Sequence, residues 1–451
     1  MNIEILDTET TIVAPATAAG GAVMMIRISG GKAITIADRL FRGKQRLENA
    51  NGYSLHYGDI VDEDGSFLDD VVVALFRAPR SYTGDDTVEF TIHGSQYIAS
   101  RLMQLAVNYG ARMATAGEFT RRAFLAGKLD LSRAEAVADV IASDSKWSHR
   151  LASTQMRGDY ADYLVTLRSE LLKLCSLLEL ELDFSEEDVE FANREMLETM
   201  LKNIGKQIDT LTSSFALGNA IKEGIAVVIV GEPNVGKSTL LNRLVEEDRA
   251  MVSDIAGTTR DTIEATRVID GIRFRFIDTA GMHTTDDELE QMGIKRTRRA
   301  LNTAHIVLHI ASADQPTFED IDIDEQQTYI RIVNKADKFC NTPPTNDNSL
   351  LYISAKDGSN IDQLIDMLRA SVPSTQVGAD NVVVTNVRHY DALRQASSAL
   401  DMALNAMRMN MPTDLLTEDI RQVLHHLGEI TGEITSDDIL QSIFSKFCIG
   451  K

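Results

Sequence analysis

The sequence predicts a multidomain fold with three parts: an α+β N-terminal domain, an all-α helical domain, and an α/β domain inserted into the helical one. Strand and helix signals are mixed at the start of the chain, helical periodicity follows, short apolar strands come next, and helical patterns then return. Helical sequence on both sides of a compact α/β segment indicates an insertion. The expected domains are α+β at 1–125, helical at 126–222, inserted α/β at 223–375, and helical again at 376–451.

The N-terminal domain is predicted from three apolar segments typical of strands, Val23–Ile28, Val71–Phe76 and Val88–His93. In the last of these, apolar and polar residues alternate, which predicts a strand with one buried face. Glu89 lies on the polar face of that strand. A helix pattern follows, so this region is expected to mix both kinds of element.

Leucine spacing predicts the two helical segments. Leu171, Cys175 and Leu178 recur at helical intervals, and a similar stripe runs from Leu415 to Leu427. The segment Pro373–Gly378, rich in residues that favour turns, is expected to link the inserted domain to the second helical part. We expect the two helical parts to pack together.

The inserted domain begins with a phosphate-binding motif. Gly231–Ser238 has the P-loop pattern of Gly, four residues, and Gly-Lys-Ser. The apolar run Ile225–Val230 predicts a buried strand before it, and a helix pattern follows. In that context the loop N–H groups and the helix N-terminus face the phosphates. Lys237 is expected to reach the outer phosphates, and the Ser238 hydroxyl to bind Mg²⁺.

Four further segments follow in an order typical of guanine-nucleotide proteins. Gly257–Asp261 offers a second hydroxyl for Mg²⁺, at Thr259. Asp278–Gly281 ends a predicted strand, where its carboxylate can hold a metal-bound water and its last N–H can sense the γ-phosphate. Asn334–Asp337 and Ser354–Lys356 follow two other strands. Each short motif alone is weak, but five in this order predict a P-loop GTPase domain that binds GTP and GDP.

Asp337 is the expected base-reading residue. Its carboxylate can accept hydrogen bonds from the N1–H and the 2-amino group of guanine. Adenine lacks this donor pair, and a buried carboxylate left unpaired costs about 1–3 kcal/mol or more. A backbone N–H of Ser354–Lys356 is expected to contact the base O6.

Composition indicates the cellular compartment in which the chain is expected to act. No run of about eighteen apolar residues occurs, so no membrane-spanning helix is expected. The N-terminal segment lacks the pattern of a signal peptide. Cys175, Cys340 and Cys448 are well separated, which suits a reducing cytosol. The net charge of −22 argues against non-specific nucleic-acid binding by the whole surface. We expect a cytoplasmic protein without a membrane partner.

Three features separate the chain from small signalling GTPases. Met282 follows the Asp278–Gly281 segment, where a glutamine would orient the attacking water. Asn234 lies inside the P-loop, where its side-chain oxygen can bind a monovalent cation. The chain ends in Cys448–Lys451, an unusual Cys-x-Gly-Lys terminus.

Five other segments are more specific than the GTPase motifs. They are Gly117–Phe124, Gly127–Leu131, Ala134–Ala136, Leu427–Glu433 and Cys448–Lys451. In these segments, and over essentially its whole length, the chain resembles the MnmE (TrmE) family of tRNA-modifying GTPases. Ala116 departs from the family, which usually has proline before Gly-Glu-Phe, and this concerns only a local turn.

The resemblance implies a homodimer built on the N-terminal domains, with GTPase domains that meet across bound K⁺. It also implies a flavoprotein partner, MnmG (GidA). Together they would add an aminomethyl or carboxymethylaminomethyl group to carbon 5 of the wobble uridine of certain tRNAs. The one-carbon unit would come from 5-formyl- or methylene-tetrahydrofolate.

The resemblance, together with the motifs, also assigns roles to residues. The folate would be held by Arg27, Glu89, Lys128 and Lys451. K⁺ would be bound by Asn234, Ser253, Ile255 and Thr258, and Mg²⁺ by Ser238 and Thr259. The catalytic residues would be Glu290, which orients the attacking water through a second water, Lys237 and Cys448. GTP contacts are expected at Asn234, Val235, Gly236, Lys237, Ser238, Thr239, Ser253, Asp254, Ile255, Ala256, Gly257, Thr258, Thr259, Asp278, Thr279, Ala280, Gly281, Asn334, Lys335, Ala336, Asp337, Ser354, Ala355 and Lys356.

The main alternative is a protein of a different class. A GTP-dependent switch or assembly factor would dock on a ribosome or another partner without group-transfer chemistry. The GTPase domain alone fits both functions. The folate-site residues and the Cys-x-Gly-Lys terminus favour tRNA modification, and folate retention by the purified protein discriminates between the two.

Overall fold

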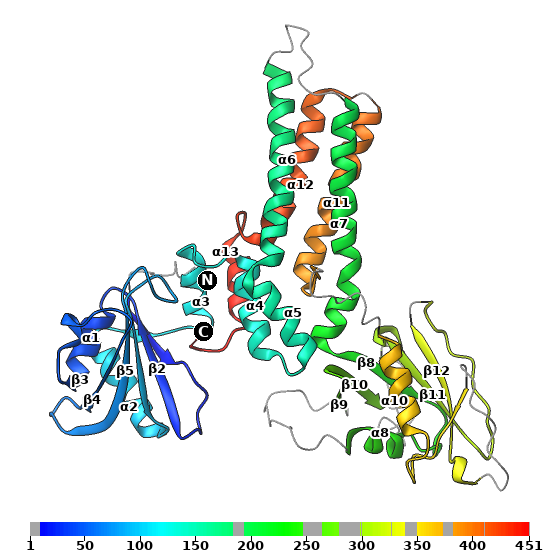
Figure 1. Ribbon diagram of the computed structural model, residues 1–451, viewed down its shortest axis with the longest axis horizontal. Helices are drawn as coiled ribbons and strands as arrows, with labels where there is room; N and C mark the ends of the chain where they lie inside the picture. The colour runs from blue at the N-terminus through cyan, green and yellow to red at the C-terminus, as the bar shows by residue number, and fades with distance from the viewer. Residues whose placement is uncertain are drawn as a thin grey trace, which may run out of the picture. The chain divides into compact units, whose positions relative to one another are not determined.

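The contacts of the chain divide it into two compact units, each built from segments that are far apart in the sequence. The computed structural model (Figure 1) describes residues 10–183, 194–246, 264–278, 298, 300–325, 327–338, 350–372, 382–409 and 411–450. The first unit comprises Met1–Ala138, Gln155–Leu172 and Leu424–Lys451, and the second comprises Asp139–Thr154 and Lys173–Val423.

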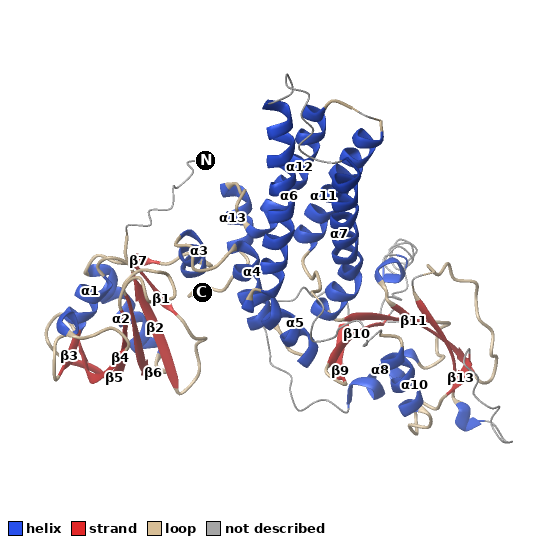
Figure 2. Ribbon diagram, turned by 45° about the horizontal axis from the view of Figure 1, so that its top comes forward, coloured by secondary structure: helices blue, strands red, loops and turns tan. Residues whose placement is uncertain are grey.

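The first unit contains a seven-stranded sheet with the strand order β3-β4-β5-β6-β2-β1-β7. Its strands are β1 (Ile12–Pro15), β2 (Val23–Ser29), β3 (Phe41–Gly43), β4 (Ser54–Val61), β5 (Phe67–Phe76), β6 (Thr87–His93) and β7 (Arg112–Met113). Neighbouring strands are antiparallel except for β1 and β7. Helices α1 (Ala33–Leu40) and α2 (Gln96–Asn108) share one apolar core with the sheet (Figure 2). The short 3-10 helix η1 (Leu47–Asn49) packs beside α1.

Alternating burial along the strands decides which side chains face away from this core. On β6, Val88, Phe90 and Ile92 are buried, whereas Glu89 is partly exposed. On β2 the same alternation leaves Arg27 facing outward. The predicted α+β fold is therefore confirmed, and the polar face of β6 lies opposite the helices.

The chain's C-terminal segment also belongs to the first unit. Helices α3 (Glu118–Leu125), α4 (Leu131–Ala142) and α13 (Asp437–Phe444) lie in this part of the chain. Leu131, Leu440 and Phe444 form a small apolar cluster there. Gly117 precedes α3 with φ +67°, and a Cβ at this position would lie 2.6 Å from the Phe444 carbonyl oxygen. Glycine therefore permits the close contact between the start of α3 and the end of α13.

Long helices confirm the predicted all-α part. They are α5 (Lys146–Arg157), α6 (Asp159–Asp183), α7 (Arg194–Glu223), α11 (Val387–Arg408) and α12 (Thr413–Thr431). Helix α7 packs against α11, where the Phe215 and Tyr390 rings stack with centroids 4.3 Å apart. Arg421 of α12 pairs with Glu179 of α6 at 2.7 Å. Within the described residues, no helix combines the length and the apolar composition needed to cross a membrane.

The second unit contains a six-stranded sheet with the order β13-β12-β11-β8-β10-β9. Its strands are β8 (Ile225–Val230), β9 (Glu264–Ile269), β10 (Ile272–Asp278), β11 (Ile306–Ser312), β12 (Thr328–Asn334) and β13 (Leu350–Tyr352). All neighbouring strands are parallel except β9 and β10. Every residue of β8 is buried, as expected for a central parallel strand covered on both faces. Helices α8 (Lys237–Glu246) and α10 (Ile361–Ala370) pack on one face.

Candidate functional site

The P-loop connects the end of β8 to α8, as the sequence predicts. Gly231 has φ +145°, and a Cβ there would overlap the Ile310 carbonyl oxygen of β11. Gly236 has φ +102°, and a Cβ there would overlap the Asn334 amide nitrogen. Both glycines are therefore required by positive φ and by close neighbours. The loop is held against two adjacent strands at their carboxyl ends, the position at which open α/β sheets bind ligands.

Lys237 is almost fully buried within the loop. Its ammonium group donates to the Gly231 carbonyl at 2.6 Å and to the Glu232 carbonyl at 2.8 Å. Lys237 is also the first residue of α8, and the N–H groups at a helix N-terminus together with a lysine ammonium favour an anion. Ser238 and Thr239 follow in the first turn of α8. This arrangement fits the phosphates of a nucleotide.

Asn334 joins the P-loop to the two segments expected to read the base. Its side-chain nitrogen donates to the Val235 carbonyl at 2.9 Å, and its side-chain oxygen accepts from the Ala355 N–H at 2.9 Å. The residue is buried. Lys335 donates to the Asn234 carbonyl at 2.7 Å. The predicted phosphate and base segments therefore form one connected site.

Asp337 is exposed and lies in the 3-10 helix η5 (Ala336–Lys338). One carboxylate oxygen accepts a hydrogen bond from the buried Ser354 hydroxyl at 2.8 Å. Lys356 is fixed through its backbone, since Arg243 donates to its carbonyl at 2.7 Å. Ser354 thus orients the carboxylate, a positioning role that the sequence motif alone does not indicate.

Several predicted site residues lie outside the described residues. They are Ser253, Asp254, Ile255, Ala256, Gly257, Thr258, Thr259, Thr279, Ala280, Gly281, Glu290 and Lys451. Asp278 is the last residue of β10, as expected. The roles expected from the sequence for the twelve residues outside the described ranges stay predictions.

A second polar site lies on the outward face of the N-terminal sheet. Arg27 of β2 and Glu89 of β6 are direct partners in the antiparallel register. The Arg27 Nε donates to a Glu89 carboxylate oxygen at 2.7 Å, and the two side chains are 14% and 16% exposed. The Arg27 guanidinium also lies 5.6 Å and 5.4 Å from the ring centroids of Tyr82 and Phe119. Ring faces attract a cation at such distances, so Arg27 is held on several sides.

The C-terminal segment of the same chain reaches this second site. Ile449 pairs with Ala116 in an antiparallel bridge, and the Gly117 N–H donates to the Cys448 carbonyl at 3.5 Å. Arg27 then donates through Nη1 to the Gly450 carbonyl at 3.3 Å. Cys448 is exposed. Residues more than four hundred positions apart are therefore brought together.

Lys128, the third cation expected at the folate site, does not contact the Arg27–Glu89 pair in the described structure. Its ammonium group donates to the Pro79 carbonyl at 2.5 Å, and the residue is exposed. Among the described residues it forms no hydrogen bond or ion pair with Arg27 or Glu89. The connection between them is indirect, through the loop of residues 77–86 that carries both Pro79 and Tyr82.

Glu118, the neighbour in sequence of Phe119, belongs to a buried ionic network that sequence reasoning missed. Glu118 accepts from Arg112 at 2.6 Å and 2.7 Å and from Arg122 at 2.9 Å. Burial opposes ionisation of Glu118, but hydrogen bonds from Arg112, the Thr115 N–H and Arg122 outweigh it and lower its pKa to about 2. The only sequence signal was an acid that directly follows Gly117, with three arginines (Arg112, Arg121 and Arg122) within six residues.

Two family models match most of the chain. The model of the MnmE helical domain matches residues 131–448, and the model of the GTP-binding protein TrmE N-terminus matches residues 11–128. A protein of Cytophaga hutchinsonii named tRNA modification GTPase MnmE is 47% identical, with 98% of each chain covered. Proteins of the same name from Bacteroides fragilis and Flavobacterium psychrophilum are 47% and 45% identical, over 98% of this chain and 100% and 99% of theirs. The chain belongs to the MnmE family of tRNA modification GTPases.

Proposed function

We propose that this chain hydrolyses GTP and, with a flavoprotein partner, takes part in adding an aminomethyl or carboxymethylaminomethyl group to carbon 5 of the tRNA wobble uridine. The observation that carries the proposal is the presence of two sites in one chain. One is the nucleotide site joined by Asn334, and the other is the Arg27–Glu89 pair that the C-terminal segment reaches. A switch that only docks on a partner needs the first site but not the second.

In the nucleotide site the chain binds and orients GTP. Lys237 exchanges two neutral carbonyl acceptors for phosphate oxygens, which makes charge-assisted hydrogen bonds. Asp337, oriented by Ser354, accepts from the guanine N1–H and 2-amino group. Ser238 would offer its hydroxyl to Mg²⁺, and the ion would supply positive charge for the phosphates.

Asn234 is the proposed contribution of the P-loop to a K⁺ site. Its backbone oxygen already accepts from Lys335, so the side-chain oxygen is the atom left for a cation. The proposal extends to Ser253, Ile255 and Thr258, and it gives Glu290 the attacking water. It predicts faster hydrolysis in K⁺ than in Na⁺, because the smaller ion fits the same oxygens poorly. Equal rates in the two salts would remove the cation from the mechanism.

In the second site the donor set fits a folate. Glu89 accepts from Arg27 through one oxygen and forms no other hydrogen bond within the described residues, so its second oxygen can accept from pterin N–H groups. Arg27, Lys128 and Lys451 provide cations for the carboxylates of the folate tail. A bound tetrahydrofolate derivative supplies the one-carbon unit. Cys448, which is exposed, completes the proposed site.

A homodimer agrees with the outward face of the N-terminal sheet. Leu55, Tyr57 and Val72 are exposed on that face by 73%, 68% and 40%. An exposed apolar patch on a sheet favours a protein partner, and a second copy of the chain is the partner proposed here. Tyr57→Lys should shift the protein to a monomer in sedimentation velocity, whereas an unchanged sedimentation coefficient would argue against this interface.

The decisive experiment is nucleoside mass spectrometry of tRNA from cells that lack this protein. The full chain should restore the modified wobble uridine. A chain lacking Cys448–Lys451 should fail to restore it, while the purified truncated protein hydrolyses GTP at the wild-type rate. Normal wobble nucleosides in the deletion strain, with defective ribosomal subunits, would favour the docking switch instead.

A further inference from the structure

The turn between β9 and β10 lies directly on the start of helix α5. The Trp147 N–H donates to the Gly271 carbonyl at 3.1 Å. Gly271 has φ +81°, and a Cβ there would lie 2.8 Å from the Lys146 Cβ. Any other residue at this position would be strained and would displace the helix. The turn is therefore shaped to touch α5.

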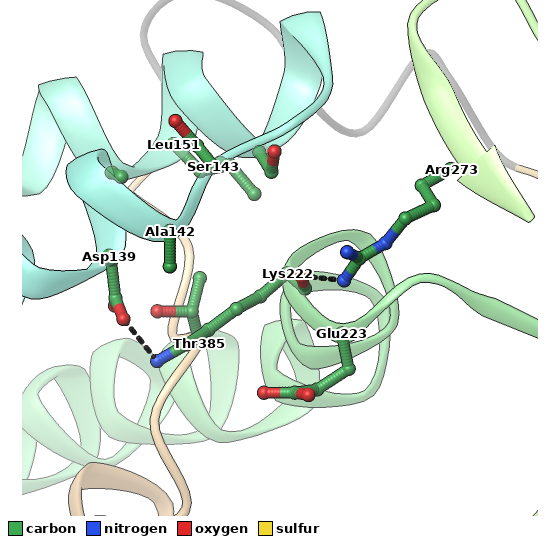
Figure 3. A pocket seen from close by; sticks show the side chains of 10 residues that line it. Asp139, Ala142, Ser143, Leu151, Lys222, Glu223, Arg273 and Thr385 are labelled. Carbon is green, nitrogen blue, oxygen red and sulfur yellow. Dashed lines mark hydrogen bonds and ion pairs between the residues drawn. The ribbon is translucent and has the colours of Figure 1, made fainter. Parts of the chain in front are cut away.

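Arg273, two residues beyond Gly271, extends the contact to two more elements. Its Nη1 donates to Asp144, in the segment between α4 and α5, at 2.5 Å. Its Nη2 donates to the Lys222 carbonyl near the end of α7 at 3.1 Å. Lys222 in turn pairs with Asp139 of α4 at 2.8 Å. Figure 3 shows Arg273 and Asp139 on opposite sides of Lys222, so one chain of polar contacts joins β10 to α7 and α4.

The contact region between Gly271 and Arg273 on one side and helices α4, α5 and α7 on the other, called the joint below, is not tightly filled. A cavity of about 190 Å³ lies among Asp139, Leu151, Lys222, Arg273 and Thr385. The buried Arg273 Nε has no hydrogen-bond partner within the described residues. An unsatisfied buried polar group weakens the contact that its side chain makes, and the cavity leaves space for that side chain to rearrange. Such a joint is suited to moving between two states.

The hairpin formed by β9 and β10 lies between two of the nucleotide-binding motifs in the sequence. Strand β9 follows the segment that contains Thr259, and β10 ends at Asp278. The hairpin therefore connects the segment expected to give a hydroxyl to Mg²⁺ with the segment expected to sense the γ-phosphate. Strand β10 pairs with β8 from Phe274 to Asp278, and β8 leads into the P-loop. A shift of β10 at its carboxyl end therefore reaches Arg273 at the other end of the same strand.

We propose that Gly271 and Arg273 are positioning residues that couple the nucleotide site to helices α4, α5 and α7. The turn holds α5 through Gly271, and Arg273 holds the α4–α5 segment and the end of α7. A change of nucleotide moves β10 and alters both contacts. This coupling rests on the proposed GTP hydrolysis and adds to it a route by which the nucleotide state reaches the helical part of the chain.

Trp147 provides the measurement, because it is the only tryptophan of the chain. It donates to Gly271 and packs against the apolar core of the six-stranded sheet. The full-length protein should show different Trp147 emission with GDP and with a non-hydrolysable GTP analogue. Arg273→Met should reduce that difference about five-fold or more, while the dissociation constant for either nucleotide changes less than about two-fold.

Arg369→Met is the matched control. Arg369 pairs with Asp270 of the same turn at 2.9 Å, but it comes from α10, and its ion pairs among the described residues, with Asp270 and Asp366, stay within the α/β part. Arg369→Met should leave the emission difference intact.

Asp144→Asn, which removes only the partner of Arg273, should reproduce the loss and cover the case in which Arg273→Met fails to fold. Wild-type hydrolysis with no emission difference, or a full difference in both joint variants, would overturn the coupling. Absence of hydrolysis in the wild type would instead overturn the proposed function.

Discussion

The two sheets of this molecule carry their sites in different ways. In the six-stranded parallel sheet, the site consists of loops at the carboxyl ends of β8 and β12 and of the segment after β13, and the Asn334 side chain joins them through backbone groups. In the seven-stranded sheet, the site consists of side chains on an open face, and the chain's far end completes it. The first site is built from short continuous segments, whereas the second exists only once distant segments have met.

The difference predicts where each site is fragile. The nucleotide site depends on glycines and on one buried amide, so its weak points are steric. The second site depends on the Arg27–Glu89 ion pair, and Phe119, which contacts Arg27, directly follows the buried and paired Glu118, so the weak points of this region are electrostatic. Four substitutions test this contrast.

The largest effect is expected at Glu118. Glu118→Gln leaves Arg112 and Arg122 without a buried carboxylate, and breaking such a pair costs about 3–5 kcal/mol. Hydrogen exchange of amides in β2 and β6 should report this loss in the free energy of unfolding. Asp437→Asn is the control, because Asp437 is 80% exposed in its pair with Arg121 and should change stability by less than about 1 kcal/mol.

The same variant tests the pH dependence. The pKa of Glu118 is lowered from 4.5 to about 2, so the folded state binds fewer protons than the unfolded state between these values. Its contribution is fully present above pH 4.5 and is lost as pH falls towards 2. Wild-type stability should fall in that window more steeply than that of Glu118→Gln. Parallel curves would contradict the assignment.

Gly236 is expected to show the next largest effect. Gly236→Ala combines a backbone of φ +102° with overlap of the Asn334 amide, so it displaces the residue that joins three motifs. The dissociation constant for GTP should rise about 100-fold, equivalent to about 2.7 kcal/mol. Gly358→Ala is the matched control, since Gly358 has φ +92° but no atom within 4 Å of an added Cβ. Similar losses in both variants would show that backbone strain, rather than Asn334, decides binding.

Local sequence explains why the first site was predictable. Apolar runs that are buried on both faces predict parallel strands, and each motif lies within a few residues of its strand end. What the motif did not indicate is that Asn334 bridges Val235 and Ala355, because that bridge forms only when β8, β12 and β13 align. Alternation also predicted correctly that Glu89 faces away from the core.

The second site was accessible only through family resemblance. The partner of Glu89 depends on the register of β2 and β6, whose residues Arg27 and Glu89 are 62 positions apart. The contact from Arg27 to Gly450 spans 423 positions. Glu118 was missed because an acid in the first turn of a helix is usually solvated. Burial of that acid follows from tertiary packing, which no local pattern encodes.

A smaller effect is expected from Asp337→Asn. The substitution replaces the acceptor for two guanine donors, and the affinity for GTP should fall by about 1–3 kcal/mol, or roughly 5- to 150-fold. Binding of xanthine nucleotide should improve, because its 2-oxo group needs a donor. Asp314→Asn, an exposed carboxylate paired with Lys338, should change neither affinity. Unchanged GTP affinity in Asp337→Asn would contradict the assigned role.

The smallest effect is expected at Lys128. Its ammonium group is exposed and is already hydrogen-bonded to Pro79, so its attraction for a folate carboxylate is screened by solvent. Lys128→Met should weaken binding of 5-formyltetrahydrofolate only about two- to five-fold, and this difference should disappear at about 0.5 M salt. Glu89→Gln is the comparison: Glu89 is 16% exposed and pairs with Arg27, so its effect should be larger and should persist in salt. Calorimetry on the full chain measures both. A loss at Lys128 as large as that at Glu89 would mean that the loop of residues 77–86 opens on binding, so that Lys128 joins Arg27 and Glu89 in one enclosed site.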